Sequence, residues 1–277
     1  VRVNKGRAHV DTRLQSGDEV RIPPIRYTEK ESEHSAPPLK LSEMPPILFE
    51  DQNIMVVDKP AGMASHGGSG ISYGLIERMR ASRPGPPFLE LVHRLDRGTS
   101  GVLVLAKTRK ALVRLHEMIR EGEMHKTYQA LVKGDWQNDR QHAKFPLFKY
   151  VTPSGERRVR VDPENGLPSH SIFRLKERFG PVSLVEVDLL TGRTHQIRVH
   201  AAELGFPLVG DEKYGDFAFN DEVAHGSLGV PFKRMFLHSG KICFHHPITG
   251  EELEIEAPLP KDCVELIEVL EQRKAQN

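Results

Sequence analysis

The chain has 277 residues, of which 38% are hydrophobic and 28% are charged. This composition is typical of a folded globular protein and too apolar for a wholly disordered chain. No apolar run reaches the roughly 20 residues that a membrane helix needs. Two cysteines exclude a disulfide framework and a four-cysteine zinc site. We therefore expect a soluble protein of a reducing compartment, the cytoplasm, with no membrane partner.

The formal net charge of +1 hides an uneven distribution along the chain. Residues 78–134 hold 12 Lys and Arg against 5 Asp and Glu, a net charge of +7, whereas residues 251–277 hold 3 bases against 8 acids, a net charge of −5. A concentrated basic segment is typical of proteins that bind polyanions. A solvated charged face would have the same composition, so charge alone leaves both interpretations open.

The first 26 residues predict two short strands joined by a turn at Gly17. A lone hairpin is marginally stable, so we expect this segment to be part of a larger unit. Residues 27–45 contain three prolines among polar residues and are predicted to be a linker. From residue 46 onward the apolar pattern is dense, and we place the main domain over residues 46–277.

The main domain is predicted to contain many short strands and few helices. Strands are expected over 47–57 in two pieces, 101–107, 127–133, 182–189, 235–244 and 252–256, and helices over 71–82, 108–122, 194–204 and a final stretch whose apolar face carries Val264, Ile267 and Leu270. Thr108 is a good N-cap and Gly122 a good terminator for the second helix. Few βαβ repeats favour an α+β fold with a mixed, mostly antiparallel sheet.

Several common catalytic motifs are absent from the sequence. It contains no GxxxxGK[ST], no HExxH and no GxSxG pattern. His195 and His200 are five residues apart, which does not place them on one helical face, and the neighbours His245 and His246 point to opposite sides of a strand. Because no recognised ligand spacing is present, we predict that the protein has no catalytic metal.

The densest group of polar residues is at 93–101, which reads HRLDRGTSG. Asp96 lies between Arg94 and Arg97, in a turn that leads directly into the predicted strand 101–107. Neighbouring arginines keep a carboxylate ionised, and a strand end holds it rigidly. Such a carboxylate can act as a nucleophile or stabilise a developing cation. For this motif alone, a surface ion pair is the simpler explanation.

A second group occupies residues 191–200, TGRTHQIRVH. It places Arg193, His195 and Arg198 within six positions, and on a helix Ile197 would face the core. These side chains can bind phosphates, or an arginine can hold a carboxylate in its fork. Taken alone, the segment is better explained as an exposed basic helix.

A third segment contains Tyr128 on the core-facing side of the predicted strand 127–133, where a tyrosine usually serves packing. Taken together, in this order and spacing, the three segments resemble the RluA family of pseudouridine synthases. The sequences KPAG at 59–62 and GDEKYG at 210–215 fit the same family. The resemblance covers about residues 46–260.

The resemblance implies a mixed, mostly antiparallel bent sheet with flanking helices and a cleft that crosses the sheet. It implies the isomerisation of uridine to pseudouridine within RNA, without a cofactor or a metal. The first 26 residues resemble the end of an S4 RNA-binding domain, followed by the linker 27–45 and a catalytic domain over 46–277. Within the family the likeness points to members that act on large-subunit ribosomal RNA, our expected partner. We expect a monomer.

The resemblance also implies roles for individual residues. Asp96 corresponds to the carboxylate that assists cleavage of the glycosidic bond, by attack on either the sugar or the uracil ring. Arg198 corresponds to its basic partner, Tyr128 to the tyrosine that stacks on the target base, and Arg94 to the arginine that enters the RNA stack. Further RNA contacts are expected from Arg97, Lys107, Arg193 and His195, and an apolar pocket wall from Leu95, Ile197 and Leu237.

Two other functions stay open on the sequence. A non-catalytic RNA-binding protein on the same scaffold would bind RNA independently of Asp96. A retaining glycoside hydrolase would use Asp96 as nucleophile and needs a second carboxyl group within about 5.5 Å. Glu90 or Asp58 are the candidates for that second carboxyl group.

Overall fold

The computed structural model describes residues 2–4, 6–7, 13, 15–21, 36–68, 72–83 and 88–276. The chain forms two units, residues 1–36 and 37–277. In the first unit, β1 (Arg2–Val3) pairs antiparallel with both β2 (Gly6–Arg7) and β3 (Val20–Arg21), which gives three short strands where the sequence predicts two. Residues 22–35, which include the first part of the predicted linker, lie outside the described residues.

Residues 37–45, which the sequence analysis assigns to the linker, belong to the larger unit. Leu39 is buried in its core, and the Leu39 N–H donates a hydrogen bond to Ser82 Oγ at 2.8 Å. The short 3-10 helix η2 (Leu41–Glu43) follows. The prolines of this stretch therefore lie in a segment that packs against the body of the larger unit.

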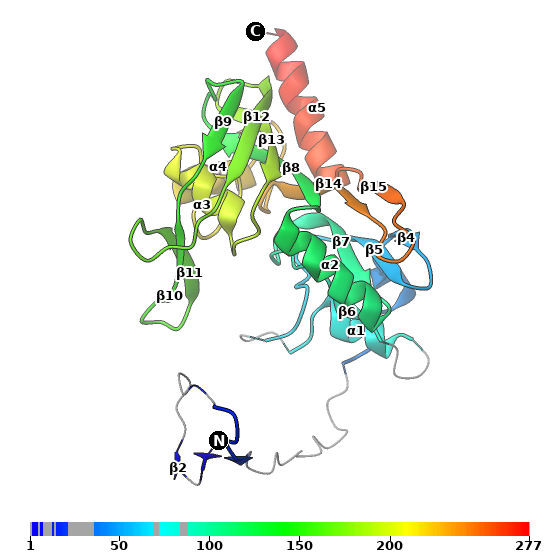
Figure 1. The fold of residues 1–277 in the computed structure, drawn as a ribbon. Coiled ribbons are helices and arrows are strands. Elements are labelled where there is room, and N and C mark those ends of the chain that lie inside the picture. Colours follow the sequence, from blue (N-terminus) through cyan, green and yellow to red (C-terminus); the bar gives the residue numbers. More distant parts are fainter. Residues whose placement is uncertain are drawn as a thin grey trace. The chain divides into compact units, whose positions relative to one another are not determined.

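The larger unit is built on a ten-stranded sheet (Figure 1). Its strand order is β4-β5-β7-β14-β8-β13-β12-β9, with β15 added beside β14 and β6 beside β7. The strands are β4 (Ile47–Glu50), β5 (Ile54–Lys59), β6 (Glu90–Leu91), β7 (Ser100–Ala106), β8 (His125–Lys133), β9 (Arg140–Ala143), β12 (Ser171–Arg178), β13 (Val182–Leu189), β14 (Leu237–His245) and β15 (Glu252–Glu256). The β7–β14 pairing is parallel and the other pairings are antiparallel, so the predicted mixed, mostly antiparallel sheet is confirmed. A separate hairpin is formed by β10 (Leu147–Val151) and β11 (Arg157–Val161).

Five α-helices occur in the described part of the larger unit: α1 (Leu75–Ala81), α2 (Arg109–Glu121), α3 (Gln196–Glu203), α4 (Phe217–Ala224) and α5 (Lys261–Gln276). Helix α2 has the predicted ends, because Thr108 accepts a hydrogen bond from the Ala111 N–H and Gly122 takes a left-handed φ of 77°. Helix α3 begins two residues later than predicted, because His195 has a left-handed φ of 54° that is incompatible with a helix.

The last helix, α5, buries a face that differs in part from the predicted one. Cys263, Leu266 and Leu270 are buried, whereas Val264 is exposed. The predicted helical spacing is correct, but the buried face is centred on Cys263 and Leu266, each one residue before the predicted Val264 and Ile267. Within the described ranges, no helix combines the length and apolarity required to cross a membrane.

Apolar side chains cover both faces of the central strands. Along β5, Ile54 and Val56 pack in one cluster with Leu115 of α2, while Met55 and Val57 pack in another on the opposite face. Helix α2 lies over one face of β5 and β7 in Figure 1. Burial on both faces explains why these strands read as continuous apolar runs rather than alternating patterns.

The start of β7 lies against the start of β14 in the middle of the sheet. Gly101 pairs with Ser239 and has a φ of 110°, and a Cβ at this glycine would lie 2.2 Å from the Ser239 carbonyl oxygen. Only glycine allows this approach. Ser100 Oγ and His238 Nδ1 form a hydrogen bond of 2.9 Å across the same pairing. The loop that enters β7 is therefore fixed over the centre of the sheet.

Candidate active site

Asp96 lies in the loop between β6 and β7, and its neighbours in the chain are held by hydrogen bonds. Ser65 Oγ donates to the Leu95 carbonyl at 2.8 Å and accepts from the Leu95 N–H at 3.1 Å. The Gly62 N–H donates to the Arg97 carbonyl at 2.7 Å, and Arg97 Nε donates to the Gly62 carbonyl at 2.9 Å. The backbone on both sides of Asp96 is thereby fixed, which orients the carboxylate.

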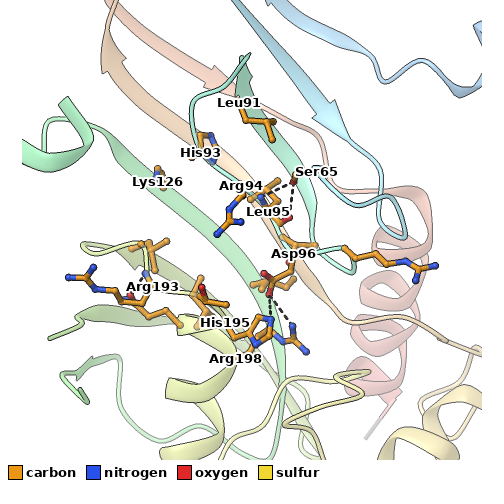
Figure 2. A pocket seen from close by; sticks show the side chains of 18 of the residues that line it. Ser65, Leu91, His93, Arg94, Leu95, Asp96, Lys126, Arg193, His195 and Arg198 are labelled. Atoms are coloured by element: carbon orange, nitrogen blue, oxygen red, sulfur yellow. Dashed lines mark hydrogen bonds and ion pairs between the residues drawn. The ribbon is translucent and has the colours of Figure 1, made fainter. Parts of the chain in front are cut away.

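Arg198 meets this carboxylate from the first turns of α3 (Figure 2). Its Nη1 donates to Asp96 Oδ2 at 3.0 Å. The Arg198 side chain is 8% exposed and the Asp96 side chain 27% exposed, so the pair lies at the boundary between the core and an open space. The structure thus brings together the two residues that the sequence analysis paired across 102 positions.

A second carboxylate, Asp211, holds the rest of the Arg198 guanidinium. Arg198 Nε and Nη2 donate to Asp211 Oδ2 and Oδ1, both at 2.7 Å, and Asp211 is completely buried. Asp211 Oδ1 also accepts the backbone N–H groups of Lys213 and Tyr214. Burial alone would raise the pKa of Asp211, but Arg198 and these N–H groups hold it below its ordinary value. Asp211 was not among the site residues predicted from the sequence.

His195 and Tyr214 complete the group around Asp96. His195 Nε2 lies 3.8 Å from Asp96 Oδ2, and His195 Nδ1 lies 2.7 Å from the Tyr214 hydroxyl. This hydroxyl also accepts the N–H of Val159 on β11, and the Arg198 guanidinium lies 5.1 Å from the Tyr214 ring centre. Burial lowers the pKa of His195, which favours its neutral form at pH 7.

Lys59, at the end of β5, is a buried cation near the same loop. Its Nζ donates to the carbonyl oxygens of Pro60 at 2.8 Å and Met63 at 2.7 Å. Burial lowers the pKa of Lys59 to about 7, although the negative charge of Asp96 acts in the opposite direction. Lys59 was not predicted as a site residue, because a lysine before a proline gives no indication of burial.

Tyr128 is buried on β8 opposite Ser239 of β14. Burial raises the pKa of Tyr128 to about 12, and the charge of Asp96 acts in the same direction. A pKa this high keeps the hydroxyl protonated at neutral pH. Tyr128 can therefore pack against a ligand and offer a hydrogen bond, but it is a poor base.

These residues open into a cavity of about 740 Å³, within the usual size range of small-molecule sites. Its lining includes all the predicted site residues except Lys107, namely Arg94, Leu95, Asp96, Arg97, Tyr128, Arg193, His195, Ile197, Arg198 and Leu237. Lys107 does not line the cavity: it follows the far end of β7, where its Nζ contacts Glu50 Oε1 at 2.7 Å and the Asp51 carbonyl.

The charges around the cavity point to an anionic ligand. Among the described lining residues are seven arginines and lysines against one carboxylate, that of Asp96. This imbalance supports the polyanion interpretation of the basic segment. Glu90 and Asp58, the candidates for a second catalytic carboxyl group, do not line the cavity, so the hydrolase alternative loses its structural basis.

Comparison with known proteins gives one consistent result. Residues 53–203 match the family model described as RNA pseudouridylate synthase. The chain is 49% identical over 274 residues to ribosomal large subunit pseudouridine synthase C of Salmonella typhi, an alignment that covers 98% of this chain and 84% of the relative. The same-named protein of Escherichia coli strain K12 is 49% identical over 263 residues, covering 94% of this chain and 81% of the relative.

Solved structures agree with the sequence comparison. The human RNA pseudouridylate synthase domain containing 4 matches with a TM-score of 0.66 and 25% identity, over 81% of this chain and 92% of that one. The human RNA pseudouridylate synthase domain containing 1 matches with a TM-score of 0.63 and 26% identity, over 84% and 97%. The resemblance found in the sequence is confirmed: the chain belongs to the RNA pseudouridylate synthase family and is an isomerase that converts uridine to pseudouridine.

Proposed function

We propose that this enzyme isomerises uridine in large-subunit ribosomal RNA and that Asp96 is its catalytic carboxylate. The target class is supported by the names of relatives that share about half of its residues. The role of Asp96 is supported by one observation above all. Among the described residues around the cavity it is the one carboxylate, and Arg198 holds it at the cavity wall.

The chemistry needs such a group. Cleavage of the bond between C1′ and N1 leaves positive character on the sugar and negative charge on the detached uracil. The base then rotates, C5 bonds to C1′, and the C5 proton is lost while N1 gains a proton. The Asp96 carboxylate stabilises the sugar cation or forms a transient bond to the sugar or the ring. Either way its oxygen must lie beside the reacting atoms.

The surrounding side chains serve positioning and water exclusion. Leu95, Ile197 and Leu237 are buried and give the cavity an apolar wall, which protects the detached base from hydrolysis. Tyr128 provides a flat ring with a protonated hydroxyl for the target base. Arg94 is exposed at the cavity rim and hydrogen-bonded to His66, which supports its proposed role of filling the gap that the everted base leaves in the RNA.

The proposal is tested with unmodified large-subunit ribosomal RNA carrying tritium at uracil C5. Wild-type protein should release tritium and form pseudouridine, whereas Asp96→Asn should bind the RNA without converting it. Asp135→Asn, the same substitution at an exposed site, is the control. Conversion by Asp96→Asn would remove Asp96 from its role. Release of free uracil would instead indicate hydrolysis, and binding without any conversion by the wild type would indicate a pure RNA-binding protein.

Three expectations from the sequence stay predictions. We infer that residues 1–26 are the end of an S4 RNA-binding domain, that the protein is monomeric, and that it acts in the cytoplasm. Analytical ultracentrifugation of the purified chain tests the monomer directly.

A further inference from the structure

The cavity extends beyond the Asp96 group into a part that the proposed chemistry does not use. It is lined by His93 from the loop after β6, His116 and Arg120 from α2, and Lys126 from β8. We call these four side chains the basic arm. Figure 2 shows His93 and Lys126 beyond Arg94, on the side away from Arg198. Each member carries N–H groups that can donate hydrogen bonds.

The hydrogen bonding of His93 leaves one donor without an acceptor. Its Nε2 accepts the Val104 N–H at 3.2 Å, so in the neutral ring the proton is on Nδ1. Nδ1 is buried and has no hydrogen-bond partner of normal geometry. Burial, and after it the charge of Lys126, lowers the pKa of the His93 ring far below its ordinary value. The nearby Arg94 backbone acts in the opposite direction but does not offset them. The ring is therefore a neutral donor in need of an acceptor.

Lys126 supplies a full charge next to this donor. It is half-buried on β8, and burial lowers its pKa to about 8, so most molecules carry the ammonium at pH 7. His116 and Arg120 are four residues apart on α2, which places them on one helical face toward the cavity. The basic arm thus combines two cations, Arg120 and Lys126, with two histidines and contains no carboxylate. Such a set suits an anion that only accepts hydrogen bonds.

We propose that the basic arm binds a phosphodiester of the RNA strand that flanks the target uridine. The inference rests on the proposed function and extends it to the path of the substrate backbone. A phosphodiester offers two charged acceptor oxygens, which match the unpaired His93 N–H and the Lys126 ammonium, whereas a uracil carbonyl would satisfy one donor and no charge. Phosphate contacts set the register of a nucleic acid on a protein. A fixed phosphate would hold the strand while the uridine turns into the cavity.

The test uses a ribosomal RNA fragment that the wild-type protein converts, with single uncharged methylphosphonates placed at each phosphate near the converted uridine. At one position the methylphosphonate should weaken wild-type binding about tenfold, because a charge-assisted hydrogen bond is lost. The same methylphosphonate should cause no further loss with Lys126→Met, which keeps the apolar stem. This variant should also lower the salt dependence of binding by about 0.7–0.9 in the log–log slope.

His93→Gln keeps an acceptor for the Val104 N–H but loses the Nδ1 donor. In this variant too, the methylphosphonate should cause no further loss of binding, which provides a second test if Lys126→Met folds poorly. Lys261→Met, at an exposed lysine that begins α5, should retain the full tenfold loss. Equal methylphosphonate effects in wild type, Lys126→Met and His93→Gln would overturn the inference. Absence of pseudouridine with the wild type would instead overturn the proposed function, so the two failures are distinguishable.

Discussion

Replacing Asp211 by asparagine tests the claim that the buried carboxylate, rather than Asp96, holds Arg198 in place. The side chain would keep its shape and an oxygen for the N–H groups of Lys213 and Tyr214. Its amide nitrogen would then face Arg198 Nε, a donor against a donor at a distance that is now 2.7 Å. The variant also removes the one buried negative charge that faces two nitrogens of the guanidinium.

The expected loss is large because the site is fully buried. Removing one partner of a buried ion pair costs about 3–5 kcal/mol, and the retained oxygen places this case near 3 kcal/mol. For the larger unit this corresponds to a fall in Tm of about 6–12 °C. An Arg198 freed from Asp211 also loses its fixed orientation toward Asp96. A misplacement of about 1 Å at a reacting group lowers kcat roughly 100-fold.

Thermal unfolding and tritium release from C5-labelled RNA measure the two effects. Asp216→Asn is the matched control, because Asp216 is 36% exposed, pairs with Lys133, and caps α4 in a way that asparagine reproduces. We expect the control to lose less than about 1 kcal/mol. If Asp211→Asn unfolds and reacts like Asp216→Asn, the claim that Asp211 positions Arg198 is wrong.

The pH dependence of the stability difference provides a second check on Asp211. Its pKa in the folded state is lowered, so its contribution to stability is present above the unfolded value of about 3.9. It is lost as the pH falls through the folded value. The gap between wild type and Asp211→Asn should therefore be constant near neutral pH and shrink in acid below about pH 4.

Two further predictions concern Lys59 and Tyr128. The pKa of Lys59 is about 7 in the fold and about 10.4 in the unfolded chain, so unfolding binds a proton between these values and stability rises with pH. Measured by urea unfolding, the free energy of unfolding of the wild type relative to that of Lys59→Met should rise by about 2 kcal/mol between pH 7 and pH 9. The same difference at both pH values would contradict this expectation. Tyr128→Phe removes the hydroxyl and its hydrogen bond, so it should lower kcat without changing RNA affinity. Because burial holds the pKa of Tyr128 at about 12, the shape of the plot of kcat against pH from 7 to 10 should not change. A rising limb near pH 9 that disappears in this variant would show that Tyr128 acts as a base.

Local patterns were enough to predict most of the central elements. The cap and terminator of α2, the strand 182–189 and the hairpin of β14 and β15 follow from adjacent residues, because turn and cap chemistry is local. Strands β9 to β12 were not predicted. Their segment alternates charged and apolar residues on strands that expose one face, so the apolar signal is diluted by arginines and lysines.

The site was predictable only in part for a different reason. Asp96 and Arg198 stand in dense motifs, but Asp211 is one acid in a polar stretch, and nothing local distinguishes a buried acid from an exposed one. Its role depends on α3 and the 210–215 segment meeting in space. The basic arm is similar, since it joins residues from a loop, a helix and a strand.

The two carboxylates that contact Arg198 differ in burial, since Asp211 is fully buried and Asp96 lies at the cavity wall. Asp211 takes Nε and Nη2 of Arg198 in a fully buried contact, which leaves Nη1 for Asp96. Asp96 is therefore held through Oδ2. Among the described residues none donates to its Oδ1, and in the proposed mechanism this oxygen would face the substrate. A lysine at position 198 has a single ammonium and cannot bridge both acids in this fork geometry. The guanidinium thus links a fully buried aspartate to a partly exposed carboxylate at the cavity wall.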